Sequence, residues 1–134
     1  MEMMTPDCFA REQSASQEPA IDPDALAGLR VLQDDGEPDV LRELIEMFLA
    51  DAEPRLASLR EAVHQGNAAV VEREAHALKG SCANFGAEPM SRICERLQAA
   101  GRSADLTNVL ALLGKLEGEY ERVCDALNGE LSKD

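Results

Sequence analysis

LTNVLALLGKLEGEYERVCDAL, residues 106–127, is the clearest helical stretch in this sequence. Its apolar residues alternate steps of three and four, the spacing that places them on one face of a helix. They are Leu106, Val109, Leu113, Leu116, Tyr120, Val123 and Leu127. Such a stripe predicts a helix that packs into a left-handed bundle at a shallow crossing angle. With only three Phe, one Tyr and no Trp, the composition also favours a helical bundle over a β-sandwich.

The N-terminal region divides into two parts. Residues 1–20 carry Ser, Gln, Glu and Pro without apolar periodicity, so we expect a disordered or loosely ordered tail. The segment IDPDALAGLRVL, residues 21–32, offers Asp22 as an N-cap and Pro23 at the first helical position. We therefore expect a short leading helix that ends near residues 34–36.

A long helix is predicted for residues 37–65, where apolar residues again recur every three or four positions. Pro54 lies inside this segment and lacks the N–H that would bond back to residue 50. It is therefore expected to kink or divide the helix. Gly66 ends the helix, and Asn67 is placed to cap the next one.

Two further helices complete the pattern. One runs from residue 68 to residue 85 and stops at Gly86; the other has Pro89 just inside its start and ends near Gly101. Short connections between helices imply antiparallel neighbours. The expected fold class is therefore all-α, an antiparallel up-down-up-down four-helix bundle with a short additional N-terminal helix. This domain is expected to span residues 21–130.

The chain is strongly acidic, with a formal net charge of −13 at pH 7. Phosphate backbones and anionic lipid surfaces would repel it, so neither a nucleic acid nor a membrane is an expected partner. No segment approaches the roughly 18 consecutive apolar residues of a membrane span, and the N-terminus lacks the features of a signal peptide. We therefore expect a soluble cytoplasmic protein.

The four cysteines, Cys8, Cys82, Cys94 and Cys124, show no CxxC spacing. A disulfide framework is not expected in a cytosolic chain of this size. The last three fall in helical patterns where a small apolar residue fits, so they are predicted to be reduced and in or near the core. The spacings do not suit zinc, and the pair of Glu-x-x-His motifs that would hold two irons is absent. No resident metal or cofactor is expected.

His76 lies in the stretch EREAHALKGSCANFGA, residues 72–87, and points away from the expected core. On a helical wheel the centre of the apolar face lies about 140° from His76. That face consists of Val71, Leu78, Cys82 and Phe85. The outer face beside His76 holds Glu72, Arg73, Gly80 and Ala83.

Two neighbours of His76 suggest a chemical role. Gly80 lies four residues on; a glycine in mid-helix costs about 1 kcal/mol relative to alanine, and here its missing side chain leaves the space over the imidazole open. Lys79 can reach the same space with its ammonium group. An exposed neutral imidazole beside a cation suits phosphoryl transfer, which needs positioning and charge compensation. The alternative from spacing alone is a solvated histidine, as expected of His64 at a helix end.

The segment AHALKGSCANFGA, residues 75–87, resembles the active-helix motif of histidine-containing phosphotransfer (HPt) domains. In that motif His-x-Leu-Lys-Gly-Ser is followed by Gly-Ala at the helix end. The matching residues are His76, Leu78, Lys79, Gly80, Ser81, Gly86 and Ala87. The resemblance covers residues 24 to 128 or so. Cys82 stands where the family often has Ser or Ala, a small change if this side chain packs inward.

The segment ICERLQAAGR, residues 93–102, resembles the corresponding helix of single-domain phosphorelay proteins from fungi and plants. In those proteins a glutamine hydrogen-bonds near the histidine, and Gln98 occupies the matching place. Gln98 is therefore a candidate for supporting His76, the alternative being a polar flank of a core helix. Arg102 either faces the phosphoryl site or closes the helix.

The resemblance implies a phosphorelay carrier in which His76 accepts a phosphoryl group from a receiver-domain aspartate and passes it to another. The expected partners are receiver domains of response regulators and hybrid sensor kinases, which carry the Mg²⁺ that transfer needs. No autonomous kinase or phosphatase activity is expected, and the protein is expected to be a monomer. Alternatives are the phosphoacceptor domain of a chemotaxis-type kinase, and a structural or adaptor bundle with a degenerate motif. A dimerising sensor-kinase helix pair is disfavoured because no Pro-containing turn signature follows HALKGS.

Overall fold

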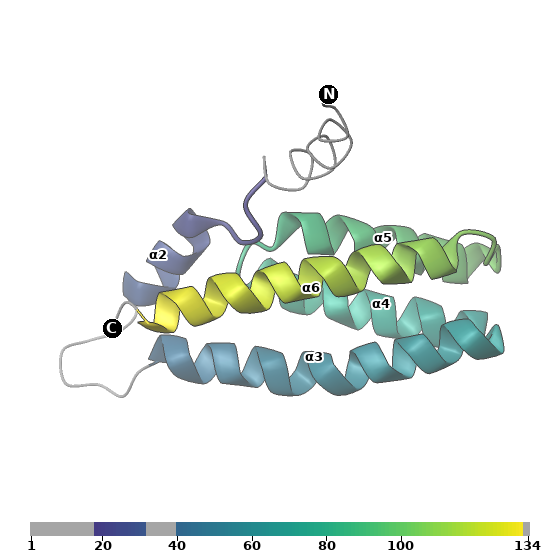
Figure 1. Cartoon of the computed structure of the whole chain (residues 1–134), viewed down its shortest axis with the longest axis horizontal. Coiled ribbons are helices and arrows are strands. Elements are labelled where there is room, and N and C mark those ends of the chain that lie inside the picture. The colour runs from purple at the N-terminus through teal and green to yellow at the C-terminus, as the bar shows by residue number, and fades with distance from the viewer. Residues whose placement is uncertain (1–17, 32–39, 133–134) are drawn as a thin grey trace, which may run out of the picture.

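The computed structural model describes residues 18–31 and 40–132, and within these ranges every regular element is a helix (Figure 1). The helices are α2 (Pro23–Val31), α3 (Val40–Gln65), α4 (Ala68–Ala83), α5 (Glu88–Ser103) and α6 (Val109–Ser132). The predicted all-α fold class is confirmed. None of these helices combines the length and apolar character needed to cross a membrane.

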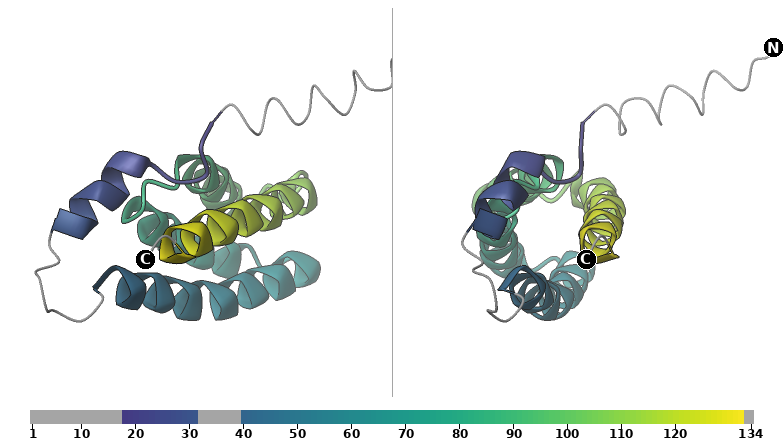
Figure 2. Two further views of the ribbon diagram at one scale, coloured as in Figure 1. Left: turned by 60° about the vertical axis from the view of Figure 1, so that its left-hand side comes forward. Right: turned by 90° about the vertical axis from the view of Figure 1, so that its left-hand side faces the viewer.

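The four long helices lie side by side around one core. α3, α4, α5 and α6 follow one another around a ring, as the view along the bundle shows (Figure 2), and successive helices run in opposite directions (Figure 1). α4 and α5 form the most extensive helix pair, and α6 closes the ring by packing against both α5 and α3. The shorter α2 lies at one end of the bundle. This is the predicted up-down-up-down arrangement.

α6 supplies the apolar stripe that the sequence predicts, although the helix starts and ends later than the predicted stretch, residues 106–127. Leu106 is half-buried and precedes the helix, which begins at Val109 and continues to Ser132. A turn delays the start, because the Asp105 carboxylate accepts hydrogen bonds from the Thr107 backbone N–H (3.3 Å) and hydroxyl (2.7 Å). The buried residues of the stripe are Val109, Leu113, Leu116, Tyr120, Val123 and Leu127.

α2 starts as predicted. The Asp22 side chain accepts a hydrogen bond from the backbone N–H of Asp24 at 2.9 Å, and Pro23 is the first helical residue. The backbone N–H of Asp22 also donates to the carbonyl of Phe85 at 3.1 Å, which ties α2 to the turn after α4. The predicted end of this helix, near residues 34–36, lies outside the described residues.

Two of the last three residues of the predicted tail, Glu18 and Ala20, pack against the bundle. The Glu18 carboxylate pairs with Arg92 of α5, and its backbone carbonyl accepts a hydrogen bond from Arg122 of α6 at 2.7 Å. Ala20 is buried. Contacts that no periodicity reveals therefore hold Glu18 and Ala20, whereas Pro19 between them is exposed. Residues 1–17 lie outside the described residues.

α3 passes through Pro54 as one helix of 26 residues, so of the two expected effects, a kink or a division, the division does not occur. Pro54 and Ala50, whose carbonyl lacks the usual N–H partner, are both exposed, and water can hydrate that carbonyl. The proline thus lies where a missing hydrogen bond costs least. The helix ends at Gln65 as predicted, and Gly66 follows with a φ of 70°. The first three residues of the predicted helix lie outside the described part of the chain.

Gly101 lies inside α5, not at its end. The helix continues to Ser103 and closes at Ala104 with a φ of 58°. Gly101 is buried, and a Cβ atom on it would lie 2.6 Å from the backbone N of Glu72 and 2.7 Å from the carbonyl O of Ala68. The glycine is therefore required by a close approach of the α4 and α5 backbones. The close approach allows exposed side chains of α4 and α5 near His76 to contact one another.

Candidate functional site

α4 carries the candidate site and has well-defined ends. Asn67 caps it, accepting a hydrogen bond from the backbone N–H of Val70 at 3.3 Å. The helix ends at Ala83 rather than at residue 85, because the chain turns there and Gly86 adopts a φ of 61°. A Cβ atom on Gly86 would lie 2.3 Å from the Cβ of Asp22, so the N-terminus of α2 fits against this turn only beside a glycine.

His76 is exposed on the outer face of α4, as the helical wheel predicts. Its orientation follows from the opposite face, which packs into the core. Those core residues are Val71, Leu78 and Cys82 within the helix and Phe85 just after it, and all four are buried. The imidazole is therefore available to a macromolecular partner.

Gln98 of α5 contacts the imidazole. Its Nε2 lies 3.1 Å from Nδ1 of His76. The oxygen and nitrogen of a glutamine amide exchange places on a 180° flip, and each orientation selects one imidazole tautomer. With Oε1 toward the ring, Nδ1–H donates to Gln98 and Nε2 carries the free lone pair. Gln98 can thus determine which ring nitrogen is the nucleophile.

Lys79 and Gly80 border His76 on its C-terminal side. A Cβ atom added to Gly80 would meet nothing within 4 Å, so packing does not require a glycine here. The surface above this turn is open, as predicted. The Lys79 ammonium lies 4.0 Å from the Glu95 carboxylate of α5, with about half of each side chain exposed. The side chain of Lys79 therefore lies toward α5 and the same edge as Gln98.

A second cation borders His76 on its N-terminal side. The guanidinium of Arg102 in α5 lies 3.2 Å from the carboxylate of Glu72, one turn before His76 on α4. Arg102 therefore reaches across to α4 one turn before His76, rather than only closing α5. The two glutamates, Glu72 and Glu95, are residues whose partners the sequence does not predict.

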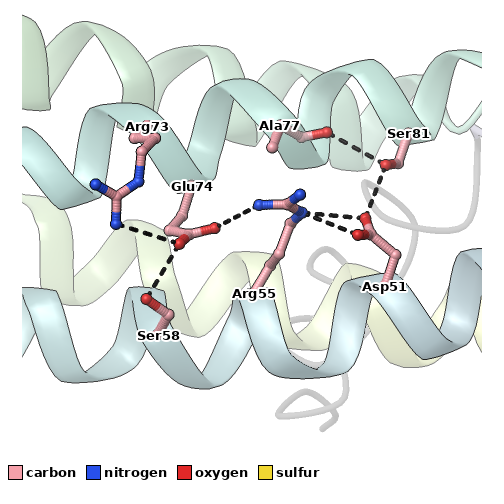
Figure 3. A network of polar contacts seen from close by, with 7 residues as sticks. All are labelled: Asp51, Arg55, Ser58, Arg73, Glu74, Ala77 and Ser81. Carbon is pink, nitrogen blue, oxygen red and sulfur yellow. Dashed lines mark hydrogen bonds and ion pairs between the residues drawn. The ribbon is translucent and has the colours of Figure 1, made fainter.

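A polar network fastens the other side of α4 to α3 (Figure 3). The Arg55 guanidinium bonds to Glu74 at 3.0 Å and to Asp51 at 3.1 Å, and Ser58 donates to Glu74 at 3.2 Å. These hydrogen bonds, first that to Glu74 and then that to Asp51, raise the pKa of Arg55. Ser81 reaches both Asp51 (3.3 Å) and the carbonyl one turn back on its own helix (3.2 Å). The network fixes the rotation of α4 about its axis, and so the direction of His76.

Glu74 is the central residue of this network, and sequence reasoning did not single it out. It is the buried charged residue of α4, with 8% of its surface exposed. It lies two positions before His76, at the border between the apolar face and the α3 side. A carboxylate at that angle on the helical wheel was the available signal, but its partners depend on the register of α3 against α4.

A family model described as Hpt domain matches residues 43–126. The match covers more than half of the chain. This protein belongs to the Hpt domain family. The motif with His76 falls inside the matched region.

Solved HPt structures have the same architecture. Histidine-containing phosphotransfer protein B (HptB) from Pseudomonas aeruginosa PAO1 matches with a TM-score of 0.78 and 29% identity, over 87% of this chain and 97% of that one. MtHPt2 from Medicago truncatula matches with a TM-score of 0.72 and 26% identity, over 99% and 95%. Histidine-containing phosphotransfer protein 2 from Arabidopsis thaliana is 25% identical over 101 residues, 73% of this chain. The alignment spans 65% of that relative's length.

The other histidine of this HPt domain has a different setting. His64 is exposed in the last turn of α3, where Nδ1 lies 2.8 Å from the backbone carbonyl of Arg60. It therefore contacts its own helix, as expected of an ordinary helix-end histidine. Only the His76 imidazole meets a side chain from the neighbouring helix within the described residues.

The described cysteines of the HPt domain are free thiols, as predicted. Cys82 and Cys94 are buried, and Cys124 is half-buried. The neighbouring Cys82 and, next, burial raise the pKa of Cys94 well above its usual range. The Cys94 thiol therefore stays protonated at neutral pH. Both buried thiols act as small core residues.

The geometry around His76 provides what a phosphoryl acceptor needs. A neutral imidazole is a nucleophile near neutral pH, and the contact with Gln98 leaves Nε2 facing outward. The surface over Gly80 admits a partner, and Lys79 and Arg102 supply positive charge at either end. Phosphoryl transfer relies mainly on such positioning and charge compensation.

Proposed function

We propose that this protein is a histidine phosphotransfer protein of a two-component phosphorelay, acting in the cytoplasm. His76 takes a phosphoryl group from a receiver-domain aspartate and passes it to the aspartate of another receiver. The observation that carries the proposal is the exposed His76, held by Gln98 beside the open surface of Gly80. Membership of the Hpt domain family supports it.

In the proposed transfer, Nε2 of His76 attacks the phosphorus of the aspartyl phosphate. The N–P bond forms as the P–O bond breaks, and the aspartate leaves as a carboxylate. Nδ1 keeps its proton and donates a hydrogen bond to Oε1 of Gln98, whose amide is oriented with the oxygen toward the ring. Onward transfer reverses these steps on a second receiver.

The receivers supply what this chain does not. The donor receiver brings the acyl phosphate and its Mg²⁺, so the carrier needs neither a nucleotide site nor a resident metal. The partners are receiver domains of response regulators and hybrid sensor kinases. The protein acts as a monomeric phosphoryl carrier without kinase or phosphatase activity of its own.

The proposal is tested by incubating the protein with each phosphorylated receiver domain of the source organism and measuring initial transfer rates. We expect rapid acquisition of an acid-labile, base-stable phosphoryl group from one or a few receivers. A parallel incubation with ATP and an isolated kinase ATP-binding domain tests the chemotaxis-type alternative. Labelling from the kinase domain but from no receiver would contradict the proposal.

Gly80 offers a test of access that is separable from stability. Gly80→Ala is expected to raise the free energy of unfolding by up to about 1 kcal/mol, because its Cβ meets nothing and alanine favours the helix. Gly80→Gln should instead slow transfer roughly tenfold, because its side chain covers the approach to the imidazole. Urea unfolding and initial transfer rates measure the two effects. Gly118→Gln, at an open position of α6, is the matched control and should transfer normally.

Gln98 offers a test of tautomer selection. Gln98→Met keeps the side-chain length but removes the hydrogen bond to Nδ1, so we expect a shifted tautomer population and transfer slowed roughly threefold to tenfold. Nitrogen chemical shifts of the His76 ring and initial transfer rates report the two. Gln98→Glu, which can only accept, should keep Nδ1 protonated. Ring shifts identical in all three proteins would show that Gln98 does not select the tautomer.

A further inference from the structure

Three side-chain contacts cross the α4–α5 interface in antiparallel order around His76. Glu72, His76 and Lys79 follow one another on α4, and they contact residues of α5 in the reverse chain order. The contacts are Glu72–Arg102 at 3.2 Å, His76–Gln98 at 3.1 Å and Lys79–Glu95 at 4.0 Å. The imidazole is thus the middle of three contacts, and each outer contact joins one cation to one carboxylate.

Both outer contacts are exposed ion pairs. The exposed fractions of the side chains are 40% for Lys79 and 66% for Glu95, and 65% for Arg102 and 38% for Glu72. Ion pairs this exposed are weak, because water screens them and two long side chains must be held in place. Each cation can therefore exchange its carboxylate for a more highly charged anion nearby.

A phosphoryl group on His76 would be that stronger anion. It carries a charge close to −2 and would lie between the two ion pairs, so it attracts both cations and repels both carboxylates. Each glutamate opposes the phosphorylated state in two ways, by holding a cation back and by its own negative charge. The first requires the partner cation, and the second does not.

We propose that Glu95 and Glu72 limit the stability of phosphohistidine by competing for Lys79 and Arg102. This inference rests on the proposed function and assigns the two glutamates as positioning residues that act through their cations. A carrier must release its phosphoryl group readily, and charge compensation by Lys79 and Arg102 alone would favour retention. Competition by the glutamates keeps the group transferable to the next receiver.

The experiment measures equilibria and lifetimes rather than transfer rates, because removing a negative charge also speeds association with an acidic partner. Each variant is equilibrated with a phosphorylated receiver and Mg²⁺, and the phosphorylated fractions of both proteins are quantified. We expect Glu95→Gln and Glu72→Gln each to shift the equilibrium toward this protein by roughly twofold to fivefold, as suits an exposed ion pair. Phosphohistidine in the isolated variants should hydrolyse more slowly by a similar factor.

Two sets of controls separate this role from a general charge effect. Glu121→Gln removes the same charge from an exposed position of α6, away from the α4–α5 interface, and should leave the equilibrium unchanged. In a Lys79→Ala background Glu95→Gln should have a clearly smaller effect, because only the direct repulsion by its charge remains. The same is expected of Glu72→Gln in an Arg102→Ala background. Thermal midpoints confirm that the variants fold alike.

Several outcomes would overturn the inference. One is an equal shift with Glu121→Gln, which would mean that net charge alone acts. Another is a full effect of Glu95→Gln without Lys79, which would mean that its charge acts directly on the phosphoryl group. If the parent labels on His76 and neither variant differs from it, the inference fails and the proposed function stands. A parent that takes no label from any receiver overturns both.

Discussion

His76→Gln is expected to abolish phosphoryl acceptance from receiver domains. Glutamine retains polarity but has no ring nitrogen that can form an N–P bond, so initial transfer should fall by at least about a thousandfold, as when a covalent nucleophile is removed. Stability should change by less than about 0.5 kcal/mol, because His76 is exposed. Transfer from a radiolabelled receiver, followed on gels, measures the first effect, and urea unfolding measures the second.

The chain contains its own control for this substitution. His64 is the only other histidine, is exposed, and contacts the Arg60 carbonyl of its own helix. His64→Gln should therefore accept phosphate at the parent rate. Retained labelling in His76→Gln would end the assignment of His76. Loss of labelling in His64→Gln with an intact fold would mean that the phosphoryl group resides on α3 instead.

The outward direction of His76 could be predicted from the sequence because it depends on one helix alone. The buried residues of α4 recur with the helical period, so their face fixes where every other residue of that helix points. Lys79 and Gly80 could be placed beside it on the same local basis, from their spacing of three and four residues after His76. The contact with Gln98 was predicted from resemblance, and the geometry agrees.

The partners of Glu72, Glu95 and Glu74 could not be predicted in this way. Exposed charges carry no periodicity, and the residue that each one meets depends on how two helices are aligned along their axes. For α4 and α5 that alignment is set by the turn at Gly86 and the close contact at Gly101. The Arg55–Glu74 contact depends in the same way on the alignment of α3 with α4.

Gly101 also shows why local signals misplace helix ends. A glycine near the end of an apolar pattern predicts a stop, and the sequence alone offers no other reason for it. In the structure its lack of a side chain serves packing between helices, while Ala104 adopts the left-handed conformation that ends α5. The same residue type serves either purpose, and only the neighbouring helix distinguishes them.

Gly101→Ala is expected to destabilise the protein despite the higher helix propensity of alanine. The added methyl would lie 2.6 Å from the backbone N of Glu72, and helical backbone cannot yield as a flexible side chain does. α5 must then move away from α4, at a net loss in the free energy of unfolding of about 1–3 kcal/mol. Gly101→Val should lose more. Urea unfolding measures both.

Gly114→Ala is the matched control, because a Cβ atom on this α6 glycine would meet nothing within 4 Å. It should raise the free energy of unfolding by up to about 1 kcal/mol, so the two alanine substitutions are expected to change stability in opposite directions.

The displacement of α5 expected in Gly101→Ala also has a functional readout. Gln98 lies one turn from Gly101, so a shift of α5 would lengthen its 3.1 Å contact with His76 and slow phosphoryl transfer in protein that is still folded. Normal transfer by folded Gly101→Ala would mean that the spacing of α4 and α5 does not control the imidazole.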